Sequence, residues 1–268
     1  MKKAKCSKIS TAVILAAGMG IRLREVIGLC PKGLLEIGGK SLILRSMQLL
    51  KKEGIEKVIL VTGFQEALYY RHFQNQDKIP KLEFVHSPKF AETGSMHSLF
   101  EAKDFLVEDF LLLESDLLYE SRALKSVINF DGSDVVLSSG KTGSNDEVFI
   151  YGENKKDDLL LDLKSGKICG EIKAISKNPC EKFSIKGELV GISKISMNLF
   201  KLMCSHYEGD LNFPNRNHYE ECISELCSEN KIPYLRVDDL VWTEIDDQSH
   251  YDRAVKEIFP KITKILKR

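Results

Sequence analysis

No stretch of this sequence is apolar for long enough to cross a lipid bilayer, so the chain is not typical of a membrane protein. The basic start, Met1 to Lys5, has no apolar segment directly behind it and therefore does not resemble a secretion signal. Lysine plus arginine number 39, as do aspartate plus glutamate, and this balance gives no indication of a nucleic-acid surface. We therefore expect neither membrane nor nucleic-acid partners.

The seven cysteines indicate neither a disulfide framework nor a zinc site. Their number is odd and no Cys-x-x-Cys pair occurs, which favours reduced thiols and a cytoplasmic location. Cys30 lies close to Lys32, and a nearby cation can lower the pKa of a thiol, although a bystander thiol is the favoured interpretation. Internal repeats and low-complexity linkers are absent, and the length suits a single domain over residues 1–268.

What the sequence does contain is a glycine-rich turn behind a strand-like run. Thr11 to Leu15 is apolar and partly β-branched, which predicts a buried first strand. Gly18 and Gly20 follow, and glycine lets the backbone turn sharply and bring N–H groups against an anion. Arg22 and Lys32 then add positive charge. This order of residues predicts a phosphate-binding loop.

The spacing excludes two familiar phosphate loops. A Walker A loop needs a glycine where this chain has Leu34, and a dinucleotide fingerprint needs one at Leu23. Leu15-Ala-Ala-Gly-Met-Gly-Ile-Arg-Leu23, followed by Pro31-Lys32, instead resembles the signature loop of the nucleotidyltransferases that make nucleoside-diphosphate-activated small molecules. An ordinary glycine-rich turn is the alternative, but such a turn needs neither the arginine nor the lysine.

Strand-like and helix-like segments alternate through the first half of the chain. Strands are predicted at 11–15, 57–62, 82–86 and 110–114, and helices at 41–53, 66–73 and 96–105. Alternation of this kind predicts an α/β fold, a Rossmann-like and mostly parallel sheet covered by helices on both faces. Ligands of such sheets bind beyond the carboxyl ends of strands, where Gly18, Glu114, Ser115 and Asp116 fall.

The middle of the chain is richer in strands, which are predicted at 134–139, 147–152, 158–163, 167–175 and 187–193. We expect a small β insertion or lid over about 141–186 that contributes the acceptor pocket to a core of about 8–140 and 187–268. Helices at 196–205 and 219–229, a strand at 234–237 and a final helix near 251–265 follow. The chain ends without an obvious domain close, so fusion to a further catalytic domain stays open, as does a homodimer.

The chain as a whole is similar to the phosphocholine cytidylyltransferase group, whose relatives include enzymes that activate 2-aminoethylphosphonate with CTP. The resemblance implies a nucleotide-diphospho-sugar transferase fold, CTP as the nucleotide and pyrophosphate as a product. It assigns Arg22 to the triphosphate and Lys32 to the charge of the transition state. It makes Asp116 and Asp246 the ligands of Mg²⁺, a cation that prefers hard oxygen ligands. Each aspartate alone is equally typical of a turn or a helix cap.

The same resemblance places the base and ribose against the segment from Glu92 to Ser98. Gly94 allows close approach of the backbone, and serine hydroxyls are able to hydrogen-bond a base edge. His97 is favoured as a packing residue, because the chemistry does not require it. Nucleotide contacts are expected from Leu15, Ala16, Ala17, Gly18, Gly20, Thr93, Gly94, Ser95, Ser98 and Ser115.

The acceptor is harder to predict. A quaternary ammonium prefers an aromatic cage, whereas a primary ammonium prefers carboxylates and hydroxyls. The phosphocholine enzymes carry an aromatic residue near Glu147, where this chain offers only polar and acidic groups. Acceptor contacts are expected from Ser144, Asn145, Asp146, Glu147, Lys173 and Glu188, with Lys177 as a second candidate for the phosphonate.

These residues favour 2-aminoethylphosphonate, and a hairpin turn with a solvated face is the structural alternative for Asn145-Asp146. Phosphocholine stays open if Trp242, Tyr151 or Tyr219 forms a cage. A sugar 1-phosphate is a further alternative, although the sugar enzymes usually need a longer acceptor domain. A nucleotide-sensing module without chemistry is the alternative outside the enzymes.

Overall fold

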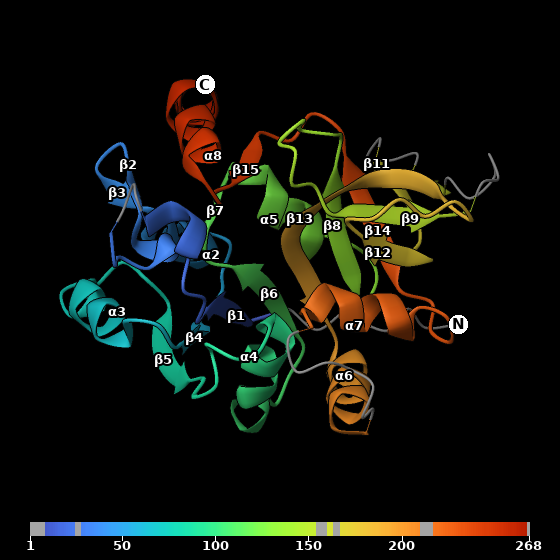
Figure 1. Cartoon of the computed structure of the whole chain (residues 1–268), viewed down its shortest axis with the longest axis horizontal. Coiled ribbons are helices and arrows are strands. Elements are labelled where there is room, and N and C mark those ends of the chain that lie inside the picture. The colour runs from blue at the N-terminus through green and yellow to red at the C-terminus, as the bar shows by residue number, and fades with distance from the viewer. Residues whose placement is uncertain (1–8, 25–27, 154–159, 163–166, 210–216, 267–268) are drawn as a thin grey trace.

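A central mixed sheet with helices on both faces organises the computed structural model, which describes residues 9–24, 28–153, 160–162, 167–209 and 217–266 (Figure 1). The main path of the sheet runs β10-β11-β14-β8-β13-β6-β1-β4-β5. Its strands are β1 (Thr11–Ala16), β4 (Lys57–Thr62), β5 (Lys81–His86), β6 (Phe110–Glu114), β8 (Val135–Ser139), β10 (Leu160–Asp162), β11 (Lys167–Glu171), β13 (Ser184–Ile195) and β14 (Pro233–Val237).

The strands β6, β1, β4 and β5 are mutually parallel, as the alternation of elements predicts. Leu15 near the end of β1 is in register with Glu114 at the end of β6. The glycine loop after β1 and the acidic turn after β6 therefore leave the sheet side by side, at the edge where parallel sheets bind ligands. The α/β fold class is confirmed.

Alternate side chains of the strands feed two separate cores. Ile14 and Leu60 point to one face, which is covered by α2 (Leu42–Lys52), α3 (Glu66–Phe73) and α5 (Arg122–Ile128). Val13 and Ile59 point to the other face, which is covered by α4 (Ser95–Glu101), α6 (Met197–Gly209) and α7 (Tyr219–Leu226). Figure 1 shows α4, α6 and α7 on the side of β6 opposite to α2 and α5. The buried strands are apolar on both sides for this reason.

The strands of the middle section join the central sheet. β9 (Phe149–Gly152) pairs with β13 and with β12 (Ala174–Ser176), while β10 and β11 extend the sheet edge through β14. The predicted strand over 167–175 is two strands, because the chain changes partner between them. The N–H of Ile172 donates to Ile232, and the next N–H, that of Lys173, donates to Tyr151.

A third core lies under the C-terminal helical run. This run consists of α8 (Gln248–Arg253), a π-helical turn (Ala254–Ile258) and α9 (Phe259–Leu266), and so begins before the predicted 251. Ile258 and Ile262 pack with Leu23 and Leu42 over the hairpin of β2 (Glu36–Ile37) and β3 (Lys40–Ser41). A separate two-stranded pair, β7 (Leu117–Tyr119) with β15 (Trp242–Glu244), joins the acidic turn after β6 to this region.

Candidate active site

A cavity of about 370 Å³ opens where these elements meet, a size in the range of small-molecule sites. The glycine loop after β1, the turn after β6, the start of α4 and the start of α7 line it, together with the chain segments before β9 and after β15. Among the predicted nucleotide contacts, all ten line this cavity: Leu15, Ala16, Ala17, Gly18, Gly20, Thr93, Gly94, Ser95, Ser98 and Ser115.

The glycine loop leads from β1 into a 3₁₀ turn at Ile21–Leu23. Gly20 has φ of +56°, and a Cβ there would lie 2.8 Å from Cγ of Lys32, so the position requires glycine on two grounds. Gly18 differs, because no atom of the described chain lies within 4 Å of the place of its Cβ. The loop is therefore tight against Lys32 at one glycine and open at the other.

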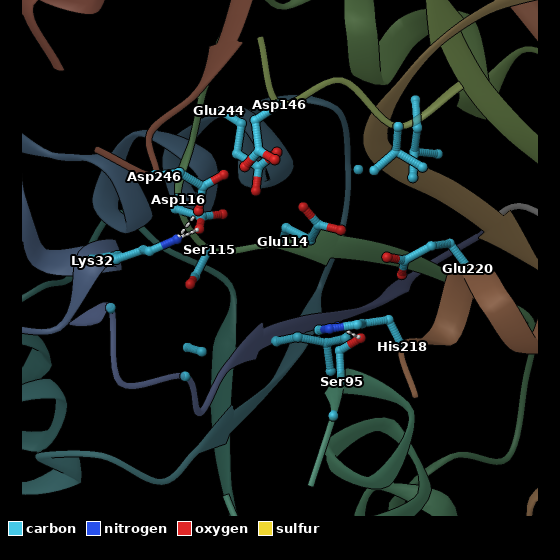
Figure 2. A pocket seen from close by; sticks show the side chains of 18 of the residues that line it. Lys32, Ser95, Glu114, Ser115, Asp116, Asp146, His218, Glu220, Glu244 and Asp246 are labelled. Carbon is cyan, nitrogen blue, oxygen red and sulfur yellow. Dashed lines mark hydrogen bonds and ion pairs between the residues drawn. The ribbon is translucent and has the colours of Figure 1, made fainter. Parts of the chain in front are cut away.

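The ammonium of Lys32 points toward two neighbouring carboxylates, as Figure 2 shows. Its Nζ is 3.0 Å from Oδ2 of Asp116, and it also donates to Oδ1 of Asp246. Burial opposes the charge of the ammonium, but the two carboxylates raise the pKa of Lys32. Burial likewise favours the neutral acid at Asp246, yet Lys32 and Arg22 lower the pKa of that carboxyl to about 2. Lys32 and Asp246 therefore each favour the charged form of the other.

Arg22 joins the glycine loop to the segment before β9. Its Nη1 is 2.6 Å from Oδ2 of Asp146, and its Nη2 is 3.0 Å from Oδ1 of Asp246. The other oxygen of Asp146 accepts from Nζ of Lys177 at 2.6 Å. Burial opposes the charge of Asp146, but these two cations outweigh it and lower the pKa of the carboxyl. Two cations of the site thus share one carboxylate at the mouth of the cavity.

A group of carboxylates lies beside Lys32. One oxygen each from Glu114, Asp116 and Glu244 falls within 4.8 Å of the others, and Asp246 lies beside Asp116, where Lys32 contacts both (Figure 2). This donor set consists of carboxylate oxygen alone, which suits a hard divalent cation. The residues therefore fit a metal of that kind. Of the predicted ligands, Asp116 belongs to this group, whereas Asp246 is outside it and contacts Lys32 and Arg22.

The carboxylates deeper in the cavity differ from Asp246 in their electrostatics. Burial, and after it Glu220 and Asp116, raise the pKa of Glu114 to about 8. Burial, and after it Glu114, raises the pKa of Glu244 as well. Tyr219 donates its hydroxyl to Oε1 of Glu114 at 2.8 Å. These acids are crowded together in a half-buried place, where their mutual repulsion and partial loss of solvation favour the neutral form.

The predicted acceptor residues divide into two groups. Ser144, Asp146, Glu147 and Glu188 line the cavity, whereas Asn145 and Lys173 do not. Lys173 pairs instead with Glu171 at 3.3 Å, and Lys177 takes the place in the cavity.

Two predicted side chains make contacts within the protein. Both oxygens of Glu188 are engaged by Thr142, through its N–H at 2.6 Å and its hydroxyl at 2.7 Å. Glu188 therefore anchors the segment that carries Asp146. Cys30 lies next to Pro31, and burial followed by Glu36 raises the pKa of its thiol, which makes it the bystander that the sequence favours.

Several residues of the cavity were not predicted from the sequence. Glu220 and His218 come from the start of α7, and Arg253 and His250 come from α8. His250 accepts from the N–H of Asp246 at 3.3 Å and contacts the carbonyl of Ser144 at 3.1 Å. It therefore links a predicted metal ligand to the acceptor segment. The only sequence signal was the cap Asp247, which accepts from the N–H of His250 at 2.9 Å.

Comparison with known proteins identifies the family of this chain. Residues 11–151 match the family model described as nucleotidyl transferase. The bifunctional protein GlmU of Methanococcus maripaludis is 30% identical over 162 residues, which are 60% of this chain and 38% of that protein. The choline-phosphate cytidylyltransferase of Streptococcus pneumoniae is 26% identical over 158 residues, or 59% of this chain and 66% of that protein.

The inositol-1-phosphate CTP transferase from T. maritima has a solved structure with the same fold, at a TM-score of 0.77 and 20% identity. The match covers 96% of this chain and 98% of that one. The chain spans between 34% and 56% of the length of the first curated relatives it matches. In the part of the chain that the structure describes, no helix is both long and apolar enough to span a membrane. The match to the family model extends over more than half of the sequence, and the chain belongs to the nucleotidyl transferase family.

Proposed function

We propose that this protein transfers CMP from CTP to 2-aminoethylphosphonate. The observation that carries the proposal is the charge of the cavity, whose lining carries both signs with an excess of acidic groups. Eight acidic side chains line it against four basic ones: Glu114, Asp116, Asp146, Glu147, Glu188, Glu220, Glu244 and Asp246 against Arg22, Lys32, Lys177 and Arg253. An acceptor that is anionic at one end and cationic at the other matches this division.

CTP is supported as the nucleotide by two relatives. The names of the choline-phosphate cytidylyltransferase and of the inositol-1-phosphate CTP transferase describe a cytidylyl donor and a small phosphorylated acceptor. In this chain the segment Thr93 to Ser98 and the backbone of Ala16 and Ala17 line the same cavity. These groups would hold the base and the ribose.

In the proposed reaction a phosphonate oxygen attacks the α-phosphorus of CTP. A new P–O bond forms, the bond to the β-phosphate oxygen breaks, and pyrophosphate leaves with both electrons of that bond. The attacking oxygen is already anionic, so a general base is not required. The protein's task is to bring two anions together and offset their charge. Arg22 would hold the leaving phosphates, and Lys32 would stabilise the charge that develops at the α-phosphorus.

Asp116 and Asp246 would hold Mg²⁺, with Glu244 and Glu114 near enough to support them. When bound, the ion would add positive charge where the two substrates meet. The short contacts of Lys32 to both aspartates support this assignment, because they mark a position where these carboxylates already accept a cation.

A primary ammonium is favoured over choline by what surrounds the acidic walls. Trp242, Tyr69 and Phe90 line the cavity, but Tyr151 and Tyr219, the other predicted members of a cage, do not. The hydroxyl of Tyr69 packs against Gly33, where an added Cβ would lie 2.9 Å from it and 3.2 Å from Cβ of Ser115. The polar end of this ring therefore lies next to Ser115. Trp242 is therefore the specific observation that keeps phosphocholine as a second candidate.

The test is pyrophosphate release from CTP and Mg²⁺ with 2-aminoethylphosphonate or phosphocholine as the acceptor. We expect a higher kcat/KM with the phosphonate, and no release when a chelator removes the metal. Faster turnover of phosphocholine would replace the acceptor but retain the cytidylyltransferase. Release with neither acceptor would contradict the proposal and direct attention to sugar phosphates or to nucleotide sensing.

A further inference from the structure

Glu220 occupies a wall of the cavity that the proposed chemistry leaves unused. It is the second residue of α7, and its carboxylate points into the cavity toward Glu114 (Figure 2). Lys32 and the aspartates it contacts lie on the opposite side of Glu114 in the same view. The cavity therefore has an end that carries Lys32 and, away from it, an end bounded by two glutamates.

One oxygen of Glu220 lacks a partner. Its Oε2 is buried, and within the described residues no group donates a hydrogen bond to it. A buried carboxylate oxygen without a donor is costly, and proteins keep such an arrangement rarely. Burial raises the pKa of Glu220 against the opposing effects of His218 and Lys177, and the Nζ of Lys177 is already 2.6 Å from Asp146. The unpaired oxygen therefore indicates a donor that comes with a ligand.

The facing carboxylate is held in place. Tyr219 donates its hydroxyl to Oε1 of Glu114 at 2.8 Å, and Gly191 leaves room for the other oxygen, since a Cβ there would lie 2.8 Å from Oε2. Gly191 also has φ of +78°, which favours glycine independently. Glu114 is thus fixed with one oxygen engaged by the protein and the other on the side of the cavity.

The backbone that carries Glu220 is fixed to the nucleotide segment. Oγ of Ser95 accepts from the N–H of Tyr219 at 3.1 Å and lies 3.1 Å from Nδ1 of His218. His218 also donates its N–H to Glu221 at 2.7 Å, which closes the first turn of α7. The position of Glu220 is therefore coupled to the wall where the base and ribose are proposed to lie.

We infer that Glu220, with Glu114 opposite, recognises the ammonium group of the acceptor and so determines the substrate class of this site. The inference rests on the proposed function and makes it specific. A primary ammonium offers three donors and a positive charge, which suits two facing carboxylates. A quaternary ammonium cannot donate a hydrogen bond, and a neutral polyol brings no positive charge to the two carboxyl groups. An acceptor whose phosphonate faces Lys32 and whose ammonium faces Glu220 can bind in one orientation only.

Binding measurements on Glu220→Gln test this. Calorimetry with 2-aminoethylphosphonate and with ethylphosphonate, which lacks the amine, gives the preference for the ammonium in each variant. We expect the wild-type protein to prefer the amine, and Glu220→Gln to weaken binding of 2-aminoethylphosphonate about tenfold to a hundredfold while leaving ethylphosphonate and CTP unchanged. Glu220→Asp, which keeps the charge, should retain part of the preference. Glu225→Gln is the matched control, because this exposed residue of the same helix contacts His206.

Equal binding of the two phosphonates by the wild-type protein would overturn the inference, as would a Glu220→Gln variant that weakens both to the same extent. A wild-type protein that prefers the amine but releases no pyrophosphate from CTP would contradict the proposed function alone. The binding measurement tests the role of Glu220, and pyrophosphate release tests the proposed function, so each can be contradicted without the other.

Discussion

Lys32 is the residue that connects the turn after β6 with the segment after β15. It follows the glycine loop in sequence, yet its ammonium contacts Asp116 from the turn after β6 and Asp246 from the segment after β15. Its charge is secured by those two carboxylates, which raise its pKa against the effect of burial. A lysine held in this way favours its charged form, and it is available to a developing negative charge.

We therefore expect Lys32→Met to lower kcat by about a hundredfold or more, because one preorganised charge partner of the transition state is lost. The KM for the acceptor should change much less. Lys40→Met is the matched control, since the Lys40 ammonium lies outside the cavity and donates to Oε1 of Gln48 at 2.7 Å. Pyrophosphate release at saturating substrates measures the effect. Near-native turnover of Lys32→Met would remove this lysine from the mechanism.

The site residues that the sequence predicts belong to motifs with fixed spacing. The glycine loop, Lys32 and the acidic turn at Asp116 follow strands, so the carboxyl-end rule for parallel sheets locates them. Glu220 carried no such signal. With Glu221 it forms an acidic pair in the first turn of a helix, which is the ordinary composition of a helix start. Only the packing of α7 against the sheet directs Glu220 into the cavity, and that packing is not local in sequence.

Among the packed elements, the C-terminal helical run contacts the β2–β3 hairpin through the ring of Phe259. The guanidinium of Arg45 lies 4.8 Å from the centroid of the Phe259 ring. A Cβ at Gly38 would lie 2.2 Å from the tip of the same ring, whereas a Cβ at Gly39 would have no atom of the described chain within 4 Å. The hairpin turn and the helix therefore fit each other only because Gly38 has no side chain.

Two alanine substitutions separate this contact from backbone strain. Gly38 has φ of +59° and Gly39 has φ of +72°, so alanine is strained by about 1–2 kcal/mol at either position. Only Gly38→Ala must also displace Phe259, at a further cost of about 1–3 kcal/mol. We expect a lower free energy of unfolding for Gly38→Ala than for Gly39→Ala in urea titrations. Equal values would show that the helix is not seated by this ring.

Local sequence patterns predicted the bounds of a helix or strand well where that segment packs with the same neighbours along its whole length. The predicted bounds of β4, α3 and β6 agree with the structure. The helix predicted over 96–105 ends at Glu101, because the chain tightens into a 3₁₀ turn in which Ala102 donates to Leu99. The short strands β7 and β15 were not predicted, since each forms only by pairing with a segment more than a hundred positions away. Register between distant segments is not encoded in local periodicity.

For the molecule as a whole, the acidic cavity lowers the free energy of unfolding, and the apolar packing of the rest of the fold must offset this. The two cores on either side of the sheet are apolar, and the pair of β7 and β15, which packs into the core under α2 and the core under the C-terminal helices, joins the acidic turns. Groups that bind a charged ligand are generally suboptimal for the free protein, because their charges are buried without partners until the ligand arrives. Glu220 is the clearest instance of this conflict.

The conflict predicts a pH-dependent gain of stability in Glu220→Gln. Burial raises the pKa of Glu220, so the folded state holds this proton more tightly than the unfolded chain does. Stability that depends on the proton is complete below the unfolded pKa, about 4.3, and is lost as the pH rises through the folded value. The variant has no such proton to lose.

Without acceptor, we therefore expect the Tm of Glu220→Gln to exceed that of the wild-type protein by a few degrees at pH 8, on the order of 2–4 °C for each kcal/mol of relieved charge burial. The difference should nearly vanish at about pH 4, just below the unfolded pKa of about 4.3, where the carboxyl is mostly protonated in both states. Adding 2-aminoethylphosphonate at pH 8 should stabilise the wild-type protein more than the variant and so reverse their order. Thermal unfolding at the two pH values, with Glu225→Gln as control, measures all three quantities. A Tm difference that does not depend on pH would mean that Glu220 is already solvated or paired in the free protein.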